Sequence, residues 1–323
     1  MRAARRSTDL PWLFSPGVDV ATFLGSCVAA LCGLAVGAWA GVLTGDTPQW
    51  TWVPAILLID VAHVYATCFR VYFQPQEFLR RRWLYVLVPL LSYGFAWAVY
   101  SESRELFWTL LAYAAVFHFV RQQYGWVAMY RAREGETSRF SWWVDALAIY
   151  LATIYPLLYW HANLPRQFWW FVESDFARLP VVLVWIVRPI YGLAMVAYFG
   201  RSFLRGWRHG LWNPGKDIVV LTTALYWYLG IITLNSDFAF TVTNVIIHGV
   251  PYMVLVYLVS RRQSPPGEKR GGAGSVCWSF WARYGCWHTS KSYCGTEVCG
   301  TNVPGCSARP GTRNFLATGL CRS

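Results

Sequence analysis

The sequence has few charged residues, and acidic residues are the scarcest of them. Only 14% of the 323 residues are charged, and Asp and Glu together number 16 against 28 Lys and Arg, whereas 56% of the chain is hydrophobic. A chain so poor in charge lacks the polar surface of two soluble domains, so we predict that lipid is its main solvent. The 20 Trp and 19 Tyr agree, because amphipathic rings accumulate at membrane–water interfaces.

Long apolar runs take the place of the missing charge. Runs of roughly 17–25 residues, the length that crosses a bilayer as a helix, predict about eight spans. They cover residues 18–44, 51–73, 84–100, 106–130, 141–161, 180–200, 217–234 and 239–259. We therefore expect an all-α fold, a polytopic transmembrane helical bundle within residues 1–262. The first run is too long for a cleaved signal peptide and lacks a small-residue cleavage site.

Basic residues alternate between the loops in a way that orients the chain. When successive loops are placed on opposite sides, one side holds 15 Lys and Arg and the other side holds three. Because cytoplasmic loops carry the excess of Lys and Arg, we predict a bacterial inner-membrane protein with a cytoplasmic N-terminus. The net charge of +12 then reports topology, so we expect membrane lipid and no nucleic acid as a partner. The first side carries Arg2, Arg5, Arg6, Arg80, Arg81, Arg82, Arg131, Arg133, Arg139, Arg201, Arg205, Arg208, Lys216, Arg261 and Arg262; the second carries Arg104, Arg166 and Arg178.

Residues 263–323 break this pattern. Six of the nine cysteines lie here among Gly, Ser, Arg, Thr and Trp, with no C-x-x-C pair and no sustained apolar run. The spacing argues against a metal or redox module, and a cytoplasmic location disfavours structural disulfides. We interpret the segment as an irregular tail, either disordered or translated out of frame from a GC-rich gene. We favour the second reading, because shifted GC-rich codons yield this composition, and we assign the tail no chemistry.

Three histidines fall at about the same depth in three spans. His63 and His118 each lie 12 residues after the start of their spans at 51 and 106, and His248 lies 9 residues after 239. All three spans run in the same direction, so at about 1.5 Å per residue their imidazoles share one layer near the midplane. His161 ends the fifth span nearer the outer surface, where it closes this layer from above or sits in the interface. Ionisable groups at such depth are costly and mark candidate functional positions.

Polar neighbours accompany these histidines on the same helix faces. Asp60 precedes His63 by three residues, and Arg121 follows His118 by three, spacings that align side chains along a helix. We predict that Asp60 and Arg121 are catalytic residues and that they pair with each other. Asp60 alternatively joins a metal's ligand set, or fixes an imidazole tautomer by hydrogen bonding to a ligating histidine.

Buried imidazoles with a nearby carboxylate suit iron, copper or zinc, since neutral imidazole is the commonest metal ligand in proteins. We predict a metal site, with iron as the cofactor, formed by His63, His118, His248 and His161. A metal centre inside a bilayer meets lipid-soluble molecules, so the predicted function is a non-haem metal-dependent oxidoreductase that acts on a lipophilic small molecule. Three alternatives stay open: a proton-coupled transporter, a haem carrier, and a non-catalytic membrane protein whose buried polar residues pack its helices.

Single histidines spread over the helices of a polytopic protein resemble the bacteriorhodopsin-related membrane dioxygenases that cleave β-carotene to retinal. The resemblance covers the architecture of residues 18–259 and implies iron-binding histidines. The chain departs from that family because its histidines stand alone rather than in a paired-His segment. It also lacks the H-x-x-x-H and H-x-x-H-H boxes of membrane desaturases and hydroxylases, which argues against a di-iron site. The strings HVYAT, HFVRQQYG and HGVPY are similar to those of uncharacterised bacterial inner-membrane proteins, a likeness that implies no activity.

Overall fold

The computed structural model describes residues 10–43, 48–166 and 175–263, without the side chains of Gln49, Trp52 and residues 261–263. Within these ranges every regular element is a helix and none is a strand, which confirms the predicted all-α class. The tail from residue 264 onward lies outside the described residues, and its interpretation stays a prediction.

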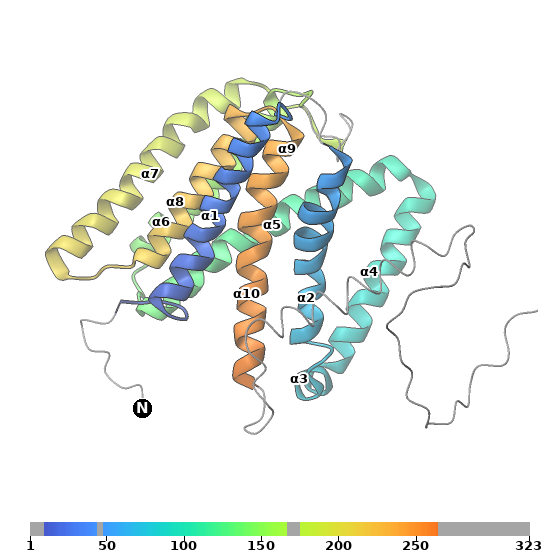
Figure 1. Ribbon diagram of the computed structural model, residues 1–323, viewed down its shortest axis with the longest axis horizontal. Coiled ribbons are helices and arrows are strands. Elements are labelled where there is room, and N and C mark those ends of the chain that lie inside the picture. Colours follow the sequence, from blue (N-terminus) through green and yellow to red (C-terminus); the bar gives the residue numbers. More distant parts are fainter. Residues whose placement is uncertain (1–9, 44–47, 167–174, 264–323) are drawn as a thin grey trace, which may run out of the picture. The chain divides into compact units, whose positions relative to one another are not determined.

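The described residues form α-helices joined by short 3₁₀ and π-helical pieces (Figure 1). The α-helices are α1 (Pro16–Trp39), α2 (Ala62–Arg70), α3 (Pro75–Arg80), α4 (Arg82–Glu102), α5 (Arg104–Glu134), α6 (Arg139–Ala162), α7 (Val182–His209), α8 (Pro214–Trp227), α9 (Asp237–Phe240) and α10 (Ile246–Gln263). The other pieces are the 3₁₀-helix η1 (Gln49–Thr51) and the π-helices η2 (Trp52–Val61), η4 (Tyr228–Thr233) and η5 (Thr241–Val245).

Seven helical stretches are long and apolar enough to cross a membrane. They are Pro16–Trp39, Val53–Arg70, Arg82–Glu102, Arg139–Ala162, Val182–His209, Pro214–Thr233 and Asp237–Ser260. Each overlaps one of the spans predicted from the sequence. The chain therefore has the helical content of a membrane-embedded protein.

The remaining predicted span corresponds to α5, which is long enough, at 31 residues, but more polar. It carries His118, Arg121, Gln122 and Gln123 in its middle, and it is not among the seven. Gln123 is buried and accepts a hydrogen bond from Thr223 of α8 at 3.1 Å. Neighbouring helices thus supply partners to α5, and such partners are what lets polar groups reside in a bilayer.

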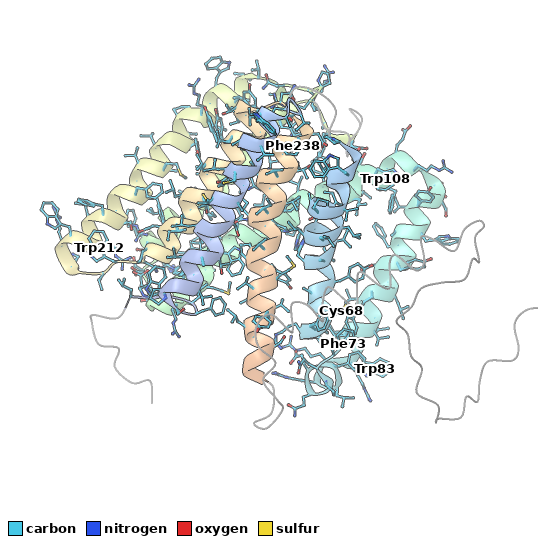
Figure 2. The ribbon with its side chains drawn as sticks, viewed as in Figure 1. Cys68, Phe73, Trp83, Trp108, Trp212 and Phe238 are labelled. Atoms are coloured by element: carbon cyan, nitrogen blue, oxygen red, sulfur yellow. The ribbon has the colours of Figure 1, made fainter. Side chains whose placement is uncertain are left out.

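Helices distant in sequence pack closely where glycine removes a side chain. α10 lies beside α1 and α2, and α6 lies beside α7 and α8 (Figure 1). A Cβ at Gly33 of α1 would lie 2.7 Å from Val242 Cγ1, and Gly37 faces the ring of Phe238, labelled near the end of α1 in Figure 2. Since real Cβ contacts are longer than this, α1 approaches η5 and α9 only because these positions are glycine.

In contrast, α4 is almost unpacked. None of the residues of α4, all of which the structure describes, is buried, and the helix packs chiefly against α5. Trp83 near the start of α4 and Trp108 near the start of α5 are 65% and 52% exposed, and Figure 2 shows them at opposite ends of α4. Exposed tryptophans at both ends of an apolar helix are typical of a helix whose ends lie at the two membrane interfaces.

Candidate metal centre

Two of the predicted histidine ligands follow π-helical segments. His63 lies in the first turn of α2, directly after the π-helix η2, and His248 lies in the first turn of α10, directly after η5. A π-helix has an extra residue per hydrogen-bonded ring, so it rotates the following residues relative to a regular helix, and such segments are frequent at functional sites. Here both rotations precede a histidine of the same cluster.

The structure brings together His63, His118 and His248. One ring nitrogen from each lies within 4.8 Å of the others, and the Nε2 atoms of His63 and His248 are 3.0 Å apart. The ring centroids of His118 and His248 are 5.1 Å apart, and those of His63 and His118 are 6.0 Å apart. The shared depth expected from the sequence therefore corresponds to a real meeting of three side chains.

The two buried histidines have the spacing that a single metal ion requires. Two nitrogens that bind a metal at about 2.1 Å with an angle of roughly 90–110° between them lie about 3.0–3.5 Å apart. The Nε2 separation of His63 and His248 falls at the short end of that range. His118 is exposed whereas the other two are 3% and 1% exposed, so one edge of the cluster is open to the surroundings. Three ligands on one side would leave coordination positions free on the open side.

The Nδ1 atoms of the two buried histidines can each form one more hydrogen bond. Among the described residues, His63 Nδ1 and His248 Nδ1 are buried without a hydrogen-bond partner. Asp60 Oδ1 lies 3.5 Å from His63 Nδ1, on the side of the ring away from His248. A carboxylate at that nitrogen favours the tautomer with the proton on Nδ1, which leaves Nε2 free to bind a metal. Asp60 is therefore placed to orient a ligand rather than to be one.

Further contacts fix the position of His248. Gln122 of α5 donates a hydrogen bond to the backbone carbonyl of His248 at 2.7 Å, and the Phe119 ring lies 4.1 Å from the His248 ring. One turn along each helix, Thr67 and Tyr252 share a hydrogen bond of 3.0 Å. Gly249 allows α10 to approach η2, since a Cβ there would lie 2.6 Å from Ile59 Cγ2. Sequence patterns did not single out Phe119 or Gly249, because their roles depend on which helices are neighbours.

Arg121 and His161 do not join this cluster. Arg121 donates to the Tyr150 hydroxyl of α6 at 2.5 Å and lies over the Tyr124 ring, so it does not form the predicted pair with Asp60. The ring of His161 is bonded at Nδ1 to its own helix, at the Leu157 carbonyl 2.6 Å away, and at Nε2 to the Tyr113 hydroxyl 3.2 Å away. Both nitrogens of His161 are thus engaged at the end of α6, away from the three clustered histidines.

Comparison of the chain with protein-family models, curated proteins and solved structures finds no match. The likeness to carotenoid-cleaving dioxygenases and to bacterial inner-membrane proteins therefore stays a prediction from the residues themselves.

Proposed function

We propose that this protein is a membrane-embedded, non-haem metal-dependent oxidoreductase in the bacterial inner membrane. Its metal, iron, is held by His63, His118 and His248. The observation that carries the proposal is the convergence of three imidazole nitrogens within 4.8 Å of one another, from three different helices. Three single histidines scattered over the sequence meet in this way only if the fold assembles them.

The donor set favours a non-haem metal over the alternatives. Imidazole ligands suit iron, copper and zinc, and a ligand set with open positions is typical of metal sites that react with substrates. Haem held between two histidines needs room for a flat macrocycle between their nitrogens, and the 3.0 Å separation of His63 and His248 leaves none. Helix packing alone explains the pair of buried rings but gives no reason for the third ring to point at them.

The position of the open edge of the histidine cluster supports a lipid-soluble substrate. His118 is the exposed member of the cluster, and it sits on α5, the helix against which the unburied α4 packs. In a bilayer, a molecule that approaches this edge comes from the hydrocarbon region rather than from water. The metal would supply Lewis-acid and redox chemistry there. Asp60 would orient the ring of His63, and Gln122 would hold the backbone of His248 in place.

Metal content tests the proposal. The full chain is purified in detergent, and iron, copper and zinc are quantified by mass spectrometry for the parent and for His63→Ala, His118→Ala and His248→Ala. We expect near-stoichiometric metal in the parent and its loss in all three variants. His209→Ala is the matched control, because His209 is an exposed histidine at the end of α7. A folded parent that stays free of metal after reconstitution would contradict the proposal and favour a proton relay through the same residues.

A further inference from the structure

The helix α7 extends beyond the hydrocarbon thickness of a bilayer. It has 28 residues, which correspond to about 42 Å of helix, whereas the hydrocarbon core is about 30 Å thick. When the first 20 residues fill that core, its boundary falls near Arg201. The residues that follow include Arg205, Arg208 and the 72% exposed Trp207, which are suited to the headgroup region.

A shallow open pocket of about 480 Å³, lined by residues of α7 alone, lies on the exposed face of this helix across the boundary. On the hydrocarbon side its lining is small and apolar, from Val196, Ala197 and Gly200. On the other side its lining is basic, from Arg205, Arg208 and His209. The pocket therefore combines an apolar half at acyl-chain depth with a cationic half at headgroup depth.

A buried network of charged residues holds the basic half in place. Arg205 pairs with Glu134 at 2.8 Å and with Glu136 at 2.7 Å, and Arg201 pairs with Asp145. Lys216, 2% exposed, lies 3.2 Å from Glu134 and 3.1 Å from Asp145. These helix ends are therefore fixed by ion pairs in which no charged group is left alone.

The network and its rim still carry excess positive charge. Its cations are Arg131, Arg201, Arg205 and Lys216, and its anions are Glu134, Glu136, Asp145 and the neighbouring Asp217, so the charges of the network itself balance. Arg208 is exposed in the pocket, and within the described part of the chain no ion pair of its guanidinium is found. The field at the pocket mouth therefore favours an anion.

We propose that this pocket binds an anionic phospholipid of the adjacent leaflet. Its phosphate lies against the guanidinium of Arg208, beside Arg205, and one acyl chain lies along Val196, Ala197 and Gly200. A free phosphate ion would use only the basic half of the pocket, whereas a phospholipid matches both halves and is already at the required depth. The site is separate from the histidine cluster, so it stands whether or not a metal is bound there.

Native mass spectrometry of the detergent-purified full chain tests the proposal. The chain is titrated with phosphatidylglycerol and, separately, with phosphatidylcholine of the same acyl chains. We expect tighter binding of phosphatidylglycerol and, for Arg208→Ala, about fivefold weaker binding of this lipid, the loss typical of one basic contact at a membrane surface. The matched control is Arg81→Ala, an exposed arginine outside the pocket and within the basic set of loops, which should bind as the parent does.

A second variant separates lipid binding from simple anion binding. A Cβ at Gly200 would meet nothing within 4 Å, so a side chain can be added there, and Gly200→Trp covers the apolar half of the pocket with an indole ring. We expect Gly200→Trp to lose phosphatidylglycerol while its thermal unfolding stays unchanged, and we expect millimolar inorganic phosphate not to displace the lipid. Equal binding of the two lipids, equal effects of the Arg208 and Arg81 variants, or displacement by phosphate would each overturn the proposal.

Discussion

A methyl group at Gly249 should pull the histidine cluster apart. In Gly249→Ala the new Cβ would lie 2.6 Å from Ile59 Cγ2 and 3.2 Å from the Ile59 carbonyl oxygen. Carbon atoms in ordinary contact are about 3.5–4.0 Å apart, so α10 must retreat from η2 by about 1 Å. The same retreat widens the 3.0 Å gap between the Nε2 atoms of His248 and His63 beyond the roughly 3.0–3.5 Å expected of two neighbouring ligands of one metal ion.

We therefore expect Gly249→Ala to bind metal at least about tenfold more weakly, as when a ligand loses its supporting contacts. It should also unfold at lower temperature, because overpacking costs about 1–3 kcal/mol. Affinity is measured by competition with a chelator of known strength, and stability by thermal unfolding in detergent. The control is Gly192→Ala in α7, where a Cβ meets nothing within 4 Å and the substitution should leave metal binding alone.

The double variant Ile59→Ala, Gly249→Ala removes the atom that clashes and should recover metal affinity relative to Gly249→Ala. A Gly249→Ala variant that binds metal as tightly as the parent and unfolds at the same temperature as Gly192→Ala would show that this contact does not position His248. A double variant that recovers no metal affinity would lead to the same conclusion.

Four further outcomes follow from the geometry. Asp60→Asn should weaken metal binding by about 10–100-fold while the metal stoichiometry at saturation stays one, as titration with iron would show. His161→Ala should keep its metal, because both ring nitrogens are bonded elsewhere; loss of metal in this variant would restore His161 as a ligand. Asp145→Ala should destabilise the chain by about 3–5 kcal/mol, because buried cations lose their partner, and an unchanged unfolding temperature would refute this. Partial burial raises the pKa of Glu136, but the Ser138 N–H and the Arg205 guanidinium outweigh it and hold the pKa below its ordinary value of 4.5. This contribution is present above about pH 4.5 and is lost as the pH falls through the folded-state pKa, so Glu136→Gln should flatten the loss of stability in acid.

The sequence predicts the helices well because apolar runs and helix lengths obey the same constraint, the thickness of a bilayer. The predicted spans and the observed helices differ where a helix continues through polar residues. The predicted span 180–200 stops where arginines begin, yet α7 continues to His209, since charged side chains on one face do not interrupt backbone hydrogen bonds. Likewise α5 is helical for 31 residues although its central polar stretch lowers its mean hydropathy.

The meeting of His63, His118 and His248 was accessible from the sequence because depth can be counted along each span. Which helices are neighbours within the bundle cannot be counted from the sequence in this way. The predicted pair of Arg121 with Asp60 fails for this reason, since Arg121 turns toward Tyr150 on α6. Neither the π-helices before the two buried histidines nor the close approach at Gly249 has a signature in apolar periodicity, because both arise from packing against a neighbouring helix.

X-ray absorption at the iron edge of the purified, iron-loaded chain would identify the ligands of the bound metal. We expect about three imidazole ligands at about 2.1 Å, the usual imidazole–metal distance, with one imidazole fewer in His118→Ala. A spectrum without imidazole ligands, or one that is the same in His118→Ala, would contradict the claim that the three clustered histidines form a metal centre.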